Sequence, residues 1–117
     1  MAKNKAFEWK NQSTLPVAAG VVSGDPVVVS ALPGVAETTR DSNGNAEVKH
    51  PGGLIYTLSV KAIDGSGNSA VAVGDRIYFV SGDTPKLSKK ATGVGYGYAM
   101  EAISAGSTAS IKVLILD

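Results

Sequence analysis

The 117-residue sequence contains no cysteine, a single histidine and a single tryptophan. Without cysteine the chain forms no disulfide, no thiolate zinc site and no cysteine nucleophile. The lone histidine, His50, stands between Lys49 and Pro51 and is expected to be a partly exposed turn residue at the end of a strand. Neither a cofactor nor a bound metal ion is therefore expected.

Charged residues are also scarce. Asp, Glu, Lys and Arg make up 18% of the chain, below the quarter that is usual in a soluble domain, and the formal net charge is only +1. This balance does not favour a general nucleic-acid binder, which carries a basic face. The 44% hydrophobic content excludes a wholly disordered chain. The surface is expected to be rich in small, neutral residues.

Long hydrophobic runs are missing as well. No window approaches the roughly 18 apolar residues that a membrane span requires. Near the start, Glu8, Lys10, Asn11 and Gln12 interrupt any apolar stretch of the kind found in a secretory signal. We expect a protein that is made in a cytosol and stays soluble.

Glycine is abundant instead, with 14 glycines and 5 prolines that leave no room for long helices. Short segments rich in Val, Ile, Tyr and Thr lie between them and are typical of strands, most clearly 26–29, 54–60, 76–80 and 110–116. The pattern predicts an all-β fold, a small single-domain β-barrel or sandwich. We expect this β domain over residues 15–117, preceded by a flexible or partner-ordered arm over residues 1–14.

Two parts of the chain repeat each other. Gly24-Asp25 precedes a Val run as Gly74-Asp75 precedes Ile77–Val80, an offset of 50 residues. At an offset of 63, the landmarks Gly34–Ala36 and Ala46–Val48 match Gly97–Ala99 and Ala109–Ile111. The sequence therefore predicts a degenerate internal duplication whose second copy carries about thirteen extra residues, in a hairpin through 82–85.

No motif in the chain predicts catalysis. The Gly-x-Ser-x-Gly elbow and the phosphate loop are both absent. Gly93–Gly97 alternates Gly with Val and Tyr, which favours a strand closely approached by another backbone over a nucleotide loop. Asp41–Glu47 predicts an Asn-Gly hairpin turn, with a weak surface calcium site as the alternative. The lysines at 86, 89 and 90 favour a solvated face or a contact with an acidic protein. We expect a protein that is not an enzyme.

Beyond these motifs, the order and spacing of several ordinary turns carry a family resemblance. The segments concerned are Ala18–Val29, Leu32–Thr38, Val73–Tyr78, Gly95–Ala99, Ala105-Gly106 and Val113–Leu116. Together they resemble the small capsid cement, or decoration, proteins of tailed bacteriophages, formerly a domain of unknown function and sometimes labelled recombinase-like. The sequence departs from the family pattern at Asn43–Asn45 and at Ser81–Lys90.

The resemblance implies a β domain that binds the outside of the assembled phage head and stabilises the contacts between capsomers. It implies the major capsid protein as partner, a homo-oligomer (trimer or dimer), and a place on the capsid surface of the virion after synthesis in the host cytoplasm. No nucleic-acid or membrane partner is expected. In the arm, Lys5, Phe7, Trp9 and Lys10 are the candidate capsid-binding residues, because aromatic side chains anchor interfaces and lysines steer towards acidic surfaces. In the alternative, Trp9 closes the bottom of the barrel.

A second function stays open from the sequence, that of a small carbohydrate- or ligand-binding β module of a larger assembly. The four tyrosines could line a barrel mouth and stack a sugar: Tyr56, Tyr78, Tyr96 and Tyr98. This interpretation requires the four rings to cluster on one exposed face.

Overall fold

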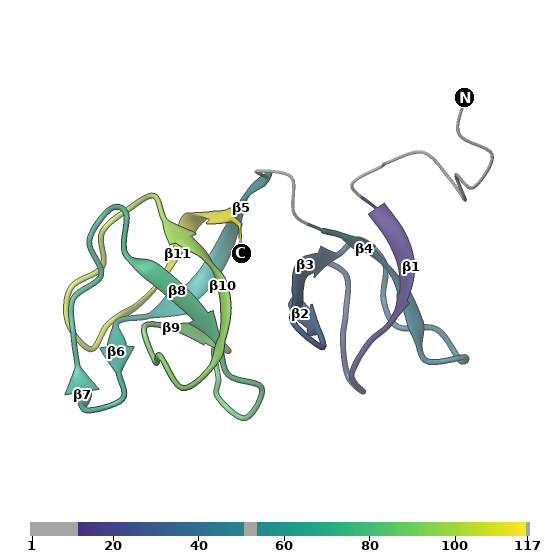
Figure 1. Cartoon of the computed structure of the whole chain (residues 1–117), viewed down its shortest axis with the longest axis horizontal. Helices are drawn as coiled ribbons and strands as arrows, with labels where there is room; N and C mark the ends of the chain where they lie inside the picture. The colour runs from purple at the N-terminus through teal and green to yellow at the C-terminus, as the bar shows by residue number, and fades with distance from the viewer. Residues whose placement is uncertain (1–11, 51–53, 117) are drawn as a thin grey trace.

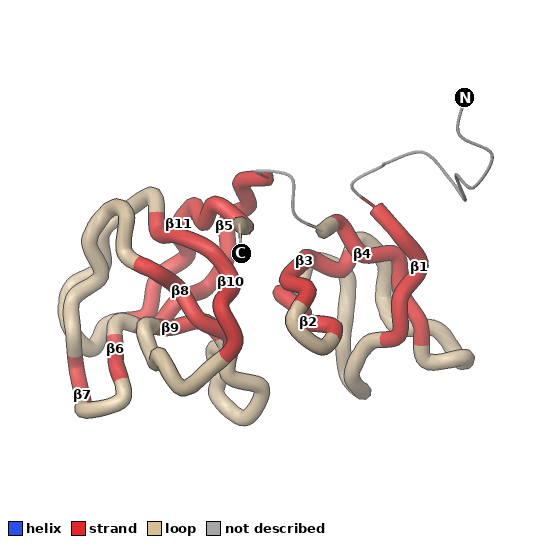
Figure 2. The backbone as a smooth tube through the Cα atoms, viewed as in Figure 1, coloured by secondary structure: helices blue, strands red, loops and turns tan. Residues whose placement is uncertain are grey.

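The computed structural model describes residues 12–50 and 54–116, and within them it contains strands, turns and no helix (Figure 2). The predicted all-β fold is confirmed. A four-stranded sheet of order β1-β4-β3-β2 comes first, and a closed five-stranded barrel of order β10-β11-β5-β9-β8 follows it (Figure 1). We call these two parts the N-terminal sheet and the barrel.

The strands of the N-terminal sheet are β1 (Gln12–Pro16), β2 (Pro26–Val29), β3 (Leu32–Ala36) and β4 (Asn45–Lys49). The barrel consists of β5 (Leu54–Lys61), β8 (Arg76–Phe79), β9 (Leu87–Ser88), β10 (Val94–Ala99) and β11 (Thr108–Ile115). A small hairpin of β6 (Ile63–Asp64) and β7 (Gly67–Asn68) projects from the barrel. Since β1 begins at Gln12, residues 12–14 belong to a paired strand, whereas the sequence analysis had placed them in the arm.

The predicted duplication is visible in the strand order. Strands β1, β4, β3 and β2 are neighbours in the same order as β5, β11, β10 and β8. At the equivalent turns, the N–H of Gly24 donates to the carbonyl of Ala36 and that of Gly74 to the carbonyl of Ala99, both at 2.7 Å. Both glycines have a positive φ, +91° and +93°, which glycine adopts without strain. The two parts are therefore copies of one four-stranded unit.

One predicted correspondence is wrong by two residues. In β3 Ala36 is paired with Val48, and in β10 Ala99 is paired with Val113, so the return strands are offset by 65 residues. The sequence analysis had matched Ala46–Val48 with Ala109–Ile111, at an offset of 63. The extra length lies in the loop before β11.

The residues inserted into the second copy close the barrel. They follow β8 and include β9, which pairs antiparallel with β8 and parallel with β5. In the first copy, β2 and β3 are joined by the two residues Ser30 and Ala31, so no strand corresponds to β9 there. The first copy therefore remains an open sheet.

Each copy has its own apolar core, and the larger one lies in the barrel. The N-terminal sheet packs one face on a small cluster that includes Val27 and Val48. Its opposite face contributes Val35 to the barrel core, where Val28 packs against it. The two parts thus share a seam, which is crossed by a 2.5 Å hydrogen bond from the Tyr96 hydroxyl to the carbonyl of Gly34.

Candidate interaction surface

The candidate residues of the arm, Lys5, Phe7, Trp9 and Lys10, lie outside the described residues, as does the question of whether Trp9 closes the barrel. Their role stays a prediction. The described residues nevertheless decide where several other sequence candidates lie, and they reveal a surface that the sequence analysis did not select.

The four tyrosines do not form a barrel mouth. Tyr96 is fully buried, whereas Tyr98 is partly exposed on the outside of the barrel. A β-bulge between Gly95 and Gly97 separates them, because it inserts an extra residue and reverses the faces of the two rings. The condition set for a sugar-stacking mouth is therefore not met.

The outside of the barrel carries a continuous row of large side chains across four strands. Ile55 is opposite Leu114, which is opposite Tyr98, which is opposite Arg76. Directly opposite residues share one face of a sheet, so these side chains lie next to one another. Ile55 is 54% exposed, and Leu116 beyond the end of β11 is 42% exposed. We call Ile55, Leu114, Tyr98, Arg76 and Leu116 the outer row.

Arg76 holds one end of the outer row in place. Its guanidinium carbon lies 4.9 Å from the ring centroid of Tyr98 and 5.9 Å from that of Tyr78, both within the range of a cation–π contact. Its Nη1 donates to the carbonyl of Leu116 at 3.1 Å. The arginine therefore orders two aromatic rings and the end of the chain's last strand into one surface suited to protein contact.

The sequence contained a signal for the outer row. In the segment 110–116 one face is β-branched throughout and buried, while the mixed face carries Lys112, Leu114 and Leu116. A leucine on the polar face of a strand is the signal. Its meaning became clear only once the register placed Leu114 beside Ile55 and Tyr98.

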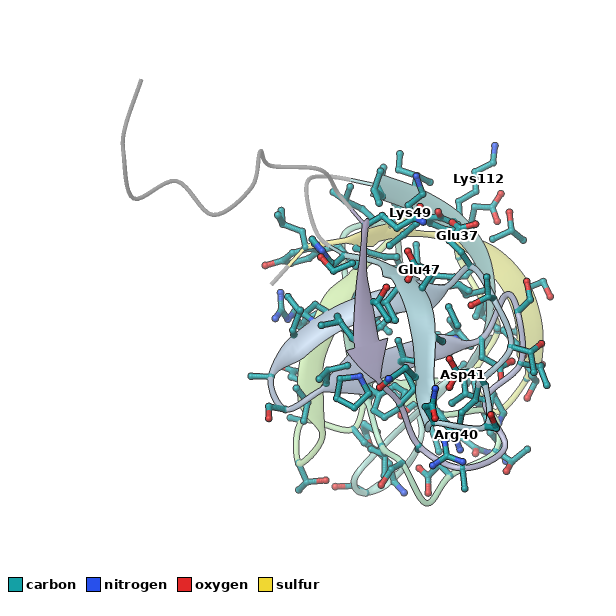
Figure 3. The ribbon with its side chains drawn as sticks, turned by 90° about the vertical axis from the view of Figure 1, so that its right-hand side faces the viewer. Glu37, Arg40, Asp41, Glu47, Lys49 and Lys112 are labelled. Atoms are coloured by element: carbon teal, nitrogen blue, oxygen red, sulfur yellow. The ribbon has the colours of Figure 1, made fainter. Side chains whose placement is uncertain are left out.

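A second contact between the two parts lies at Glu37 of the N-terminal sheet. In Figure 3 the labelled side chains of Glu37, Glu47, Lys49 and Lys112 lie in the upper part of the view, above those of Asp41 and Arg40. The Tyr56 hydroxyl of the barrel donates to Glu37 Oε1 of the N-terminal sheet at 2.8 Å. Burial, together with this hydrogen bond and the charge of Glu37, raises the pKa of Tyr56 to about 12. The hydrogen bond from Tyr56 to Glu37 is a second, solvent-accessible link between the two parts, in addition to that from Tyr96 to Gly34.

The lysines at 86, 89 and 90 do not form a free basic face. Lys89 Nζ lies 3.3 Å from Asp75 and Lys90 Nζ lies 2.8 Å from Asp83. Lys89 also donates to the Ser69 hydroxyl at 3.1 Å. The Ala72 N–H and then Lys89 hold the pKa of Asp75 below its ordinary value of 3.8. These lysines connect loops of the barrel, so the expectation of a solvated face is wrong.

The expected exposure of His50 is wrong too. Its side chain is buried, at 7% exposure, and His50 Nε2 is hydrogen bonded to Ser13 Oγ at 2.9 Å. The histidine therefore connects the end of β4 with β1.

The glycine-rich strand behaves as predicted: a Cβ on Gly97 would lie 2.1 Å from the carbonyl oxygen of Leu114, so only glycine fits there.

The described residues also bear on metal binding and on membrane insertion. Over residues 12–50 and 54–116, no three His, Asp or Glu side chains are grouped so that they could hold a metal ion. The same residues include no helix long and apolar enough to cross a membrane.

At the Asp41–Glu47 loop, the Asp41 carboxylate accepts the N–H groups of Asn43 and Asn45, as in the predicted Asn-Gly turn.

Comparison with known protein families gives a match. The model of the phage cement protein family matches residues 8–115, nearly the whole chain. Comparison with curated proteins and with solved structures gives no match. The chain belongs to the phage cement protein family. The predicted resemblance is confirmed, and membership implies a structural role in association with the phage capsid of the virion.

Proposed function

We propose that this protein binds the outer surface of an assembled phage head and stabilises the contacts between neighbouring capsomers. The observation that carries the proposal is the family match over residues 8–115, which spans both the N-terminal sheet and the barrel. Each bound copy would bury surface across a joint of the shell, and a standard interface buries about 1,600 Å² in total. The shell repeats that gain at every equivalent joint, so many modest contacts raise the barrier to rupture.

The proposal includes the major capsid protein as partner and a homo-oligomer, either a trimer or a dimer, placed over a local symmetry axis of the shell. Synthesis takes place in the host cytoplasm, before the protein joins the capsid surface. A non-enzymatic role follows from the structural family, and we propose that the protein catalyses no reaction. The outer row supports a role in protein contact because exposed Ile55 lies there beside half-buried Leu114 and Tyr98.

We also propose that the arm is a capsid contact, with Phe7 and Trp9 as anchors and Lys5 and Lys10 as steering charges. Deletion of residues 2–10 leaves β1 whole, since that strand begins at Gln12. We expect the deletion variant to fold like the wild type and to bind undecorated heads at least tenfold more weakly, measured by co-sedimentation.

Two double variants separate the apolar from the electrostatic contribution of the arm to head binding. Phe7→Ala with Trp9→Ala should weaken binding at every salt concentration, because apolar burial is not screened. Lys5→Ala with Lys10→Ala should weaken it mainly at low salt, where charges steer association. Unchanged affinity after the deletion would refute the role of the arm. Failure of the wild-type protein to bind heads would refute the proposed function itself.

A further inference from the structure

The comparison of the two copies identifies a strand edge that is covered in one copy and open in the other. In the barrel, Tyr78 of β8 is paired with Ser88 of β9. Val28 of β2 occupies the equivalent position, since Val27 is opposite Gly34 as Ile77 is opposite Gly97. β2 is paired with β3 alone, so its second edge has no neighbouring strand among the described residues.

The hydrogen-bonding groups of Val28 point towards this open edge. Val28 is opposite Pro33, and proline has no N–H to donate, so the two residues cannot exchange a pair of ladder hydrogen bonds. The N–H and carbonyl of Val28 are therefore directed away from β3. Outside the ladder with β3, no backbone hydrogen bond to either group is found within residues 12–50 and 54–116. A backbone pair of this kind is a ready template for an additional strand.

Two hollows meet at Val28 and run along the edge of β2. One, of about 350 Å³, lies between Val28 and Ser30 on one side and Phe79, Ser81 and Val94 of the barrel on the other. The second, also about 350 Å³, continues towards Asp25 and Pro26 and shares Val28, Phe79 and Ser81 with the first. Together they form one groove between the N-terminal sheet and the barrel, which we call the β2 groove.

The lining of the β2 groove indicates what kind of chain fits it. Val28, Phe79 and Val94 give the first hollow its apolar walls, and Ser30, Ser81 and Thr92 add hydroxyl groups to its lining. In the equivalent place of the barrel, β9 buries Leu87 completely. Two charged residues line the second hollow, and both make hydrogen bonds: the Asp25 carboxylate accepts the N–H of Val22, and Lys86 Nζ donates to the carbonyl of Ser81. The groove is thus suited to an uncharged, extended segment that inserts an apolar side chain where β9 inserts Leu87.

We propose that the β2 groove binds an extended segment of the capsid shell protein, which pairs with β2 and stands to the N-terminal sheet as β9 stands to the barrel. This inference rests on the proposed function, because family membership is what makes the shell protein the partner. The barrel itself shows that this four-stranded unit accepts a fifth strand at this edge. The strand added by the shell protein would supply main-chain hydrogen bonds for affinity and an apolar side chain for specificity.

The principal test is the variant Val28→Pro. Since the Val28 N–H makes no ladder bond with β3, proline preserves the sheet while removing the donor and obstructing a new strand. Val28→Ala is the matched control, because it loses a similar part of the side chain and keeps the N–H. We expect Val28→Pro to bind undecorated heads at least tenfold more weakly than Val28→Ala, with the same circular dichroism spectrum.

A second pair of variants serves if Val28→Pro does not fold. Ser81→Trp fills the groove from an exposed position, and Ser104→Trp makes the same change at an exposed position outside the groove. Only Ser81→Trp should lose at least tenfold in head binding. If all four variants bound undecorated heads as tightly as the wild type does, the groove proposal would be overturned and the proposed function would stand. Absence of wild-type binding would overturn both.

The occupant is identified by cross-linking. A small diazirine analogue of leucine at position 92, an exposed residue that lines the first hollow, should capture, on decorated heads, one peptide of the shell protein. Capture of residues 1–11 of the same chain, in the free protein and on heads alike, would overturn the proposal in favour of an internal strand. Capture of a second copy of this chain would overturn it in favour of strand exchange between protomers.

Discussion

The N-terminal sheet and the barrel use the same four-stranded unit, but only the second is closed. In the second copy β9 covers the edge of β8 and completes a ring of hydrogen bonds around a large core. In the first copy the equivalent edge stays open. One face of the sheet is covered because Val35 packs in the barrel core. A short insertion therefore distinguishes a closed barrel from an open sheet, one face of which packs on the barrel core.

The largest expected contrast concerns two equivalent glycines. A Cβ at position 97 would lie 2.1 Å from the Leu114 carbonyl oxygen, and one at position 34 would lie 2.5 Å from that of Lys49. Gly97→Ala should lower the free energy of unfolding by about 3 kcal/mol, the upper range for overpacking. Gly34→Ala should cost about 2 kcal/mol, because an open sheet shifts more easily than a closed barrel. Urea unfolding measures both values.

Two further glycines serve as controls for these substitutions. A Cβ at Gly65 or Gly82 would meet nothing within 4 Å, and neither residue has a positive φ. Alanine at either position should change the free energy of unfolding by less than about 0.5 kcal/mol. If Gly34→Ala cost as much as Gly97→Ala, the open sheet would be as rigid as the barrel and the contrast between the copies would fail.

The seam between the copies is tested by two tyrosines. Tyr96→Phe removes the buried hydroxyl that donates to the Gly34 carbonyl, which should cost about 1.5 kcal/mol. Tyr56→Phe removes the bond to Glu37 at the solvent-accessible end of the seam and should cost about 0.5 kcal/mol. Hydrogen exchange by mass spectrometry should show faster exchange in β2 and β3 for Tyr96→Phe, with β11 unchanged. Equal acceleration in β11 would mean that the two copies unfold together.

The smallest expected difference lies between the two equivalent aspartates of the Gly-Asp turns. The pKa of Asp75 is lowered in the folded protein, so its stabilising effect is present above pH 3.8 and is lost as the pH falls below that value. Asp75→Asn should therefore lower stability at pH 6 by ~0.5 kcal/mol, the size of an exposed ion pair, and should weaken the loss of stability between pH 5 and 2.

Asp25→Asn is the matched control in the first copy. Its carboxylate accepts the N–H of Val22 as that of Asp75 accepts the N–H of Ala72, but Lys89 pairs with Asp75. Thermal unfolding at a series of pH values compares the two variants. A steeper acid dependence in Asp75→Asn than in the wild type would contradict the assignment.

Much of the fold could be predicted from the turns. Gly24-Asp25 and Gly74-Asp75 mark equivalent turns. In each, the glycine has a positive φ and the following carboxylate accepts an N–H from three residues earlier, so the turn depends only on residues that are close in the sequence. The register of the return strands could not be predicted. A shift of two residues keeps every side chain on its own face, so Val48 matches Ile111 and Val113 equally well in sequence.

The candidate site was harder to predict than the fold, because its residues are placed by contacts that are distant in the sequence. Tyr96 and Tyr98 are two residues apart and would share a face in a regular strand, but a bulge sends one inward. His50 precedes Pro51 and was expected at the surface, yet Ser13, 37 residues earlier, lies against it. The open edge of β2 has no signature of its own and is recognisable only beside its covered counterpart.

The contact between Ser13 and His50 makes this protein convenient for magnetic resonance. Since the chain has a single histidine, its imidazole ring carbons and protons give one set of signals that needs no assignment by mutation. Their chemical shifts report whether β1 is docked on the end of β4, because the ring is buried there beside the serine hydroxyl. Selective labelling of histidine would thus follow the first strand of the open sheet, next to the arm, while the protein associates with fragments of a shell.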